Sequence, residues 1–495
     1  MRSRLFLLSL IAALAMPALA SPTADRTWEP QDNPTHLVIV APRGTTAYDN
    51  AQALENDNTV FAERALWRGL NKAAEILNEG GAAVVHVAIA EGVYEGQFDA
   101  GVWKVPTIEN AQGTLRIMGG YNEDFSGRQP FGLPVRLQTV YGRDGAILQF
   151  ESGSELNELV VSGLLLDASP SNKYDKRTNS LLKGESRHET LVTFGRMATN
   201  RLLVVDNIFM NGDRRAMNLT WAPASSSATV EIANNFFINN LINLETKTYP
   251  RRVSDQAAQL IVRHNSFIMN WPYNPDPSSS NVSAIELYHG DSFREMIFER
   301  NLFAYNPGGA FQHDWPEDRM GDFTIRENLF YLNGALWGNG DAEGAVIAGK
   351  FGTNPIYRVL DLYDVEDDLS ATVEDNVAFD PEIPVIMQPF QGVDSGSVQA
   401  QPTVINQVRR LFGANTDGGT VAISNFAPAL DYDVRLVPLP ANDEAKPYGV
   451  QEASDLLAAL LSVDTYAQLV LSAGWPQDHY VQKMKEAAAQ LLVVR

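Results

Sequence analysis

The chain has 495 residues, of which 45% are hydrophobic and 20% are charged, and this composition is that of an ordinary globular protein rather than a disordered one. A formal net charge of −22 disfavours nucleic acids and anionic membrane surfaces as partners. The absence of cysteine excludes a disulfide framework and thiol chemistry.

The N-terminus has the three parts of a secretory signal peptide. Arg2 and Arg4 form a positive start, Leu5 to Met16 form an apolar stretch, and Ala18-Leu-Ala20 offers small residues for cleavage. The apolar stretch is shorter than the roughly 20 residues that a membrane-spanning helix needs. We therefore expect residues 1–20 to be removed, leaving a periplasmic or secreted protein that is not inserted in a membrane.

A helix is predicted ahead of the repeats described below. Residues 21–60 are expected to form an N-terminal extension, and residues 61–78 have apolar positions at helical spacing. These positions are Leu66, Leu70, Ala73, Ala74 and Leu77. The repeats described below predict a solenoid, and a solenoid must cover the open apolar end of its first coil. We expect residues 61–450 to form this solenoid and the helix to be its N-terminal cap.

One short phrase recurs five times in the middle of the chain. Each copy starts with Asn, has Phe two residues later, and has apolar residues five and three positions before the Asn. The copies are Asn207-Ile-Phe209, Asn235-Phe-Phe237, Asn265-Ser-Phe267, Asn301-Leu-Phe303 and Asn328-Leu-Phe330. Alternation by two indicates a strand with one buried face, and a unit that recurs roughly every 30 residues predicts stacked coils.

The stacked copies predict two ladders. Asn tolerates left-handed backbone conformations, and its side-chain amide can bond to the Asn of the neighbouring coil. The phenylalanines should form a parallel buried column. The alternative is a set of antiparallel hairpins with ordinary turn asparagines, but hairpins would not need the same phrase at the same offset. His264 directly precedes a ladder Asn, and we expect it to be structural.

Segments on both sides of the repeats resemble those of a known architecture. Val85–Tyr94, followed by Leu115–Tyr121, resembles the opening coils of right-handed parallel β-helix repeat proteins, in which a strand ends in a Gly-x-Tyr turn. Asp431–Leu436, with Pro440 and Tyr448-Gly-Val450, resembles their closing segment. The resemblance implies an all-β, right-handed parallel β-helix with a polysaccharide-lyase-like architecture. That fold hosts lyases, hydrolases, epimerases and non-catalytic surface proteins, so it leaves the activity open.

The end of the chain is predicted to be helical again. Leu456, Leu457, Leu460 and Leu461 fall on one helical stripe, which Gly474-Trp-Pro476 interrupts. We expect residues 451–495 to form a C-terminal helical cap on the same elongated domain.

One acidic cluster has the ligand type of a calcium site. Asp364, Glu366, Asp367 and Asp368 offer the hard oxygen atoms that Ca²⁺ prefers, but they lack the Asp-x-Asp-x-Asp-Gly spacing. A solvated acidic turn is the favoured interpretation, so no metal site is assigned and Ca²⁺ is the one cofactor left open.

The strands after the Asn-x-Phe turns carry the candidate chemistry. Alternation is expected to turn six residues inward: Met217, Leu219, Ile242, Leu244, Ile285 and Leu287. The outward positions then form one row of Asn218, Asn243, Glu286 and Gln312 and a second row of Thr220, Glu245, Tyr288 and Asp314. Carboxylate, amide and phenol groups on one face predict a groove for a polymer chain.

A polysaccharide lyase is the activity that these side chains suggest most directly. β-Elimination from a uronate needs a base for the proton alpha to the carboxylate and a cation that neutralises this carboxylate. The residues expected to be catalytic are Lys247, Tyr288, His313 and Arg319. Substrate contacts are expected from Glu245, Arg252, Glu286, His289, Asp314 and Trp315.

Other activities stay open at this point. An inverting hydrolase would use two carboxylates from Glu245, Glu286 and Asp314, and an epimerase or a non-catalytic glycan-binding or surface-structural protein would use the same fold. The chain has neither the Asp-rich calcium cluster with paired Arg typical of pectate lyases nor the Gly-His-Gly motif of polygalacturonases. We expect a monomer that binds a polysaccharide or oligosaccharide.

Overall fold

The computed structural model describes residues 34–383 except 57, 97–100, 141–144, 176–179, 189, 247–257, 272, 274–282, 288–292, 307–308, 314–321, 334–346, 350–357 and 361–371. It also describes residues 387–389, 427, 430–432 and 439–451. The predicted signal peptide and, apart from Gln451, the predicted C-terminal helical cap therefore lie outside the described residues.

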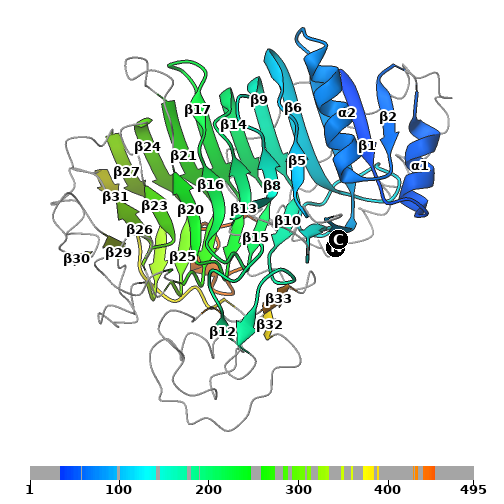
Figure 1. The fold of residues 1–495 in the computed structure, drawn as a ribbon. Coiled ribbons are helices and arrows are strands. Elements are labelled where there is room, and N and C mark those ends of the chain that lie inside the picture. Colours follow the sequence, from blue (N-terminus) through cyan, green and yellow to red (C-terminus); the bar gives the residue numbers. More distant parts are fainter. Residues whose placement is uncertain are drawn as a thin grey trace, which may run out of the picture.

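Three long sheets of parallel strands make up most of the structure (Figure 1). Sheet A contains, in spatial order, β2 (Val60–Glu63), β1 (His36–Val40), β3 (Val84–Ala90), β6 (Glu109–Tyr121), β9 (Glu155–Ser162), β14 (Ala198–Val205), β18 (Thr229–Ala233), β21 (Ala258–Arg263), β24 (Phe293–Glu299), β27 (Asp322–Arg326) and β31 (Thr372–Glu374), with β17 (Ala222–Pro223) beside β14. Sheet B contains β4 (Gly92–Glu95), β7 (Val135–Gln138), β10 (Leu164–Asp167), β15 (Ile208–Met210), β19 (Phe236–Ile238), β22 (Ser266–Ile268), β25 (Leu302–Ala304) and β28 (Leu329–Tyr331). Sheet C contains β5 (Trp103–Val105), β8 (Ala146–Phe150), β13 (Thr190–Phe194), β16 (Arg215–Leu219), β20 (Ile242–Thr246), β23 (Ile285–Leu287) and β26 (Phe311–His313).

Successive segments of the chain add one strand to each sheet in turn. Strands β14, β15 and β16 are followed by β18, β19 and β20, and each pairs in parallel with its counterpart in the next segment. This order is that of a solenoid and is consistent with a parallel β-helix. It excludes the antiparallel-hairpin alternative for the Asn-x-Phe repeats.

The remaining elements are small. They are helix α1 (Thr46–Leu54), helix α2 (Leu66–Asn78), the 3-10 helix η5 (Asp443–Ala445) and three antiparallel pairs: β11 (Tyr174–Asp175) with β12 (Ser180–Leu181), β29 (Ile347–Gly349) with β30 (Arg358–Leu360), and β32 (Met387–Pro389) with β33 (Leu430–Tyr432).

The predicted phenylalanine column is confirmed. Phe209, Phe237, Phe267, Phe303 and Phe330 are all fully buried. Neighbouring rings stack with centroids 4.8 to 5.1 Å apart and planes within 16° of parallel. The spacing follows from the distance of about 4.8 Å between strands of adjacent coils.

The asparagine ladder is confirmed as well. Each leading Asn donates its side-chain amide to the Oδ1 atom of the Asn in the next coil, at 3.0 to 3.1 Å from Asn207 through Asn328. The same Oδ1 atom also accepts the backbone N–H of the previous ladder Asn, as Asn265 does for Asn235. Asn376 extends the ladder by one residue beyond the five predicted copies.

The ladder Asn was expected to have a left-handed backbone conformation, and this expectation is wrong, because the conformation occurs one residue earlier. The residue directly before it has the positive φ, as at Asn234 (57°), His264 (52°) and Arg300 (53°). This preceding residue forms the corner between sheets A and B, which leaves the ladder Asn free to turn its amide into the stack. His264 is therefore a corner residue, in agreement with its predicted structural role.

The corner histidine should make stability depend on pH. Burial, helped by Arg300 and Arg263, lowers the pKa of His264 to about 4. Between pH 6.5 and 4 the unfolded chain therefore binds a proton that the folded chain does not, so the free energy of unfolding falls as the pH drops, by up to about 1.4 kcal/mol per pH unit. We expect His264→Asn, which copies Asn234 at the same corner, to flatten this dependence in urea unfolding series. Equal slopes for both proteins would contradict it.

Sheet A begins before the predicted helix. Strand β1 lies between β2 and β3, within the stretch expected to be an N-terminal extension. Helix α2 starts at Leu66 rather than at residue 61 because Val60–Glu63 is a strand. Its buried face joins the interior cluster, and it approaches sheet A so closely that a Cβ atom at Gly69 would lie 2.4 Å from Val40.

A closing segment, residues 439–451, runs back across the outer side of sheet B. Its Ala441 N–H donates to the Glu382 carbonyl, and its Gly449 N–H donates to the Arg300 carbonyl at 2.8 Å. The last two contacts are Val450 N–H to Ser266 Oγ and Gln451 N–H to Asn234 Oδ1. Gly449 has a φ of 72°, and a Cβ there would lie 2.5 Å from Ser266 Oγ, so the segment can approach only with glycine.

Candidate functional site

Only part of the predicted site falls within the described residues. Glu245 lies in β20 and Glu286 in β23, and the backbone of His313 ends β26. The other predicted site residues lie outside the described ranges: Lys247, Arg252, Tyr288, His289, Asp314, Trp315 and Arg319. The acidic turn that begins at Asp364 lies outside them too.

One row of polar side chains follows the outer face of sheet C. In register, its members are Lys104, Gln149, Thr193, Asn218, Glu245, Glu286 and Gln312. The neighbouring row packs in the interior: Leu148, Val192, Met217, Leu244, Ile285 and Phe311. Because strand residues alternate between faces, the polar row faces away from the interior. We call it the sheet C row.

The predicted composition of the outward rows needs a correction. The structure pairs Asn218 with Glu245, so Glu245 stands in the row where Asn243 was expected. Asn243 is instead buried beside a turn, where its Oδ1 accepts the side-chain amide of Asn240 at 3.0 Å. Thr220 lies just beyond the end of β16, and its hydroxyl donates to the Phe194 carbonyl. The inward packing of Met217 against Leu244 fixes this register, and the turns before the two strands differ in length.

The sheet C row changes from exposed to buried along the solenoid. Lys104 is exposed and Asn218 is half-buried, whereas Glu245, Glu286 and Gln312 are 0% exposed. Two carboxylates therefore lie in register on adjacent strands, about 4.8 Å apart at the backbone, within a covered part of the face.

Arg215 forms an ion pair with Glu245. Both side chains are buried, so the guanidinium compensates a carboxylate that would otherwise be costly to remove from water. Sequence reasoning missed Arg215. The available signal was a charged residue two positions before the inward Met217, where alternation predicts an apolar side chain.

Three strands of sheet C stop at the same level. Thr246, Leu287 and His313 are the last residues of β20, β23 and β26, and they pair in register. Leu287 packs in the interior. The residue after each of these ends is Lys247, Tyr288 or Asp314.

The outer faces of sheets A and B are occupied by the chain itself. Helix α1 packs on the N-terminal part of sheet A. Further along sheet A, ion pairs connect Glu231, Arg263, Glu299 and Arg326 across adjacent strands. The outer face of sheet B is apolar, and residues such as Phe236 and Leu302 are covered by Ala445 and Val450 of the closing segment.

The described residues contain no group of three or more His, Asp or Glu side chains placed to hold a metal ion. No helix among them is long and apolar enough to cross a membrane.

The comparisons add no family to this description. Comparison with protein-family models, with curated proteins and with solved structures finds no match for the chain.

Proposed function

We propose that this chain is an exported polysaccharide lyase that acts on a uronate-containing glycan along the sheet C row. The observation that carries the proposal is the common end of β20, β23 and β26. Lys247, Tyr288 and Asp314 directly follow these three strand ends in the sequence. This connectivity supports the grouping of Lys247, Tyr288 and Asp314 around the end of the strand that carries His313.

The proposed reaction divides between a base and a cation. Lys247, Tyr288 or His313 takes the proton alpha to the uronate carboxylate, and Arg319 neutralises the charge that develops on this carboxylate. The C–O bond beta to the carboxylate then breaks as the carbon–carbon double bond forms, and the glycosidic oxygen leaves as a hydroxyl group after it takes a proton from the protonated base or from water. Arg252, His289 and Trp315 contact the sugar chain beside them. A planar guanidinium suits the carboxylate because it donates two parallel hydrogen bonds.

The choice of face rests on what the other two faces hold. The closing segment packs on the outer side of sheet B, and four charged residues of sheet A are paired with one another: Glu231, Arg263, Glu299 and Arg326. The sheet C row carries amide, hydroxyl and amine groups that are not fully buried at Lys104, Gln149, Thr193 and Asn218. Such groups can hydrogen-bond to a glycan. We also infer that the solenoid winds right-handed and that α2 and residues 451–495 cap its ends.

Non-catalytic glycan binding is the second candidate. The observation that favours it is the full burial of Glu245 and Glu286, with Glu245 held by Arg215. Carboxylates so enclosed serve the packing of the row rather than a substrate. In that case the exposed part of the row, from Lys104 to Asn218, would bind the chain of sugars without cleaving it.

A product assay separates the candidates. We expect the mature protein to release unsaturated ends from a panel of uronate polysaccharides, seen as ultraviolet absorbance of the new carbon–carbon double bond. His313→Ala and Arg319→Ala should each reduce turnover by about 10²–10⁴-fold with little change in melting temperature. Arg43→Ala, which changes an exposed arginine in the N-terminal part, serves as the matched control.

The other outcomes assign the chain differently. New reducing ends without absorbance would indicate a hydrolase, and binding without any product would support the second candidate. Full turnover by both variants would reject the proposed catalytic residues.

A further inference from the structure

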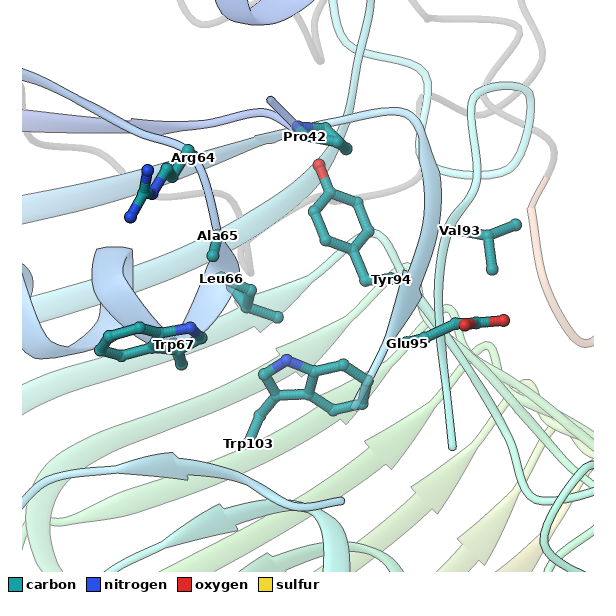
Figure 2. A pocket seen from close by; sticks show the side chains of 9 residues that line it. All are labelled: Pro42, Arg64, Ala65, Leu66, Trp67, Val93, Tyr94, Glu95 and Trp103. Atoms are coloured by element: carbon teal, nitrogen blue, oxygen red, sulfur yellow. The ribbon is translucent and has the colours of Figure 1, made fainter. Parts of the chain in front are cut away.

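A cavity of about 330 Å³ lies at the N-terminal end of the solenoid (Figure 2). The first turn of α2 forms one side, and Tyr94 and Glu95 of β4 and Trp103 of β5 form the other. The volume is at the lower end of the range for small-molecule sites, about 300–1,000 Å³, and suits a ligand with a single ring.

Two indole rings line this cavity. Trp103 is only 5% exposed, yet its indole N–H has no acceptor anywhere in the described part of the chain, and Figure 2 shows this nitrogen on the side facing Leu66 and Tyr94. Trp67 is 39% exposed, and the Arg68 guanidinium lies 4.7 Å from its ring. Because this nitrogen is open to the cavity rather than fully enclosed, water or a bound ligand there can accept its hydrogen bond.

The N-terminus of α2 adds further donors. Leu66 and Trp67 are the first two residues of α2 and line the cavity, and their N–H groups have no intrahelical acceptor. The cap residue, Ala65, provides no side-chain hydrogen bond to the helix. Arg64 precedes them, is exposed, and forms no ion pair with any residue that the structure describes. A helix N-terminus beside a guanidinium favours an anionic group.

The opposite wall has a different character. The Tyr94 hydroxyl donates to the Ala90 carbonyl at 3.0 Å, and burial raises its pKa, so this residue offers the cavity its ring rather than a charge. Glu95 is exposed at the edge and accepts hydrogen bonds. A ligand that fits both walls therefore carries one anionic group toward α2 and hydroxyl groups toward Glu95.

We propose that this cavity binds one hexuronate ring, a six-membered sugar with a single carboxylate. The carboxylate accepts hydrogen bonds from Arg64, the start of α2 and the Trp103 indole, while Trp67 offers a flat face to the ring. The identification of the ring as a sugar rests on the proposed function.

The site itself is separate from the sheet C row. Trp103 packs in the interior, whereas the next residue, Lys104, lies on the other face of the strand and belongs to that row.

Calorimetric titration of the full mature chain tests the site. We expect saturable binding of D-galacturonate or D-glucuronate with one site per chain, and binding at least tenfold weaker for galactose and for the uronate methyl ester. Arg64→Gln and Trp67→Ala should each weaken binding about tenfold or more. Arg43→Gln, an exposed arginine outside the cavity lining, should leave it unchanged.

The outcomes distinguish this site from the proposed lyase. The proposal would be overturned if neither D-galacturonate nor D-glucuronate bound saturably. It would also be overturned if the Arg64→Gln and Arg43→Gln variants bound the uronate with equal affinity. Arg64→Gln should keep full turnover of polysaccharide if lyase activity is found, because the cavity is not in the sheet C row. Uronate binding by a chain without any lyase activity would support the cavity site and reject the catalytic proposal alone.

Discussion

Replacement of Phe267 by Ala should lower the free energy of unfolding by roughly 3–5 kcal/mol. Its ring is fully buried and stacks at 4.8 Å on both Phe237 and Phe303, so neighbours on two sides lose their contacts. The column continues through both neighbours, which limits collapse of the cavity that the substitution leaves. Chemical unfolding followed by far-ultraviolet circular dichroism gives the measurement.

Phe267→Leu is the matched control for this prediction. It retains most of the buried volume, so we expect a smaller loss than for Ala. A loss below about 1 kcal/mol for Phe267→Ala would contradict the central position of the ring in the column.

Replacement of Asn265 by Ala should cost about 3 kcal/mol through a different mechanism. The Asn265 amide donates to the Ile232 carbonyl at 2.8 Å and to Asn301 Oδ1 at 3.1 Å. Its Oδ1 accepts both the backbone N–H and the side-chain amide of Asn235 at 3.0 Å. All of these groups are buried, and each one left without a partner carries a desolvation penalty of about 1–3 kcal/mol.

The control for the ladder is an exposed asparagine pair. Asn200 donates to Asn157 at 3.2 Å on the outside of sheet A, where water can replace the lost partner. Asn200→Ala should therefore change the free energy of unfolding by at most about 0.5 kcal/mol. Similar losses at both positions, measured by the same denaturant series, would show that burial does not set the cost at Asn265.

Repetition made the interior predictable from the sequence. Phe and Asn recur at constant offsets. In every coil the Phe stacks on the next Phe and the Asn bonds to the next Asn, so all copies of the phrase predict the same local structure. Asn376 shows the limit of this signal. Val373 stands three residues before it, as in the other copies, but Ala378 occupies the position of the phenylalanine, so the repeated phrase is incomplete there.

The candidate site was harder to predict because it depends on register. Asn218 and Glu245 share a row only because of the turns that precede β16 and β20, and these turns differ between coils. The N-terminal cavity was not predicted at all. Trp67 and Trp103 belong to elements far apart in the sequence, and neither lies in a recognisable motif. Their proximity arises from the packing of α2 against the first coil.

The closing segment has a consequence for the order of folding. A solenoid made of nearest-neighbour contacts can lose its last coil without disturbing the first. Residues 439–451 instead connect Glu382, Arg300, Ser266 and Asn234, so they fasten late coils to earlier ones across more than 200 positions of the chain. These contacts join residues far apart in the sequence and cannot form until residues 439–451 have been synthesised, so they form after the coils that they connect. Once made, they prevent fraying of the later coils one at a time, so the solenoid should resist proteases as a unit.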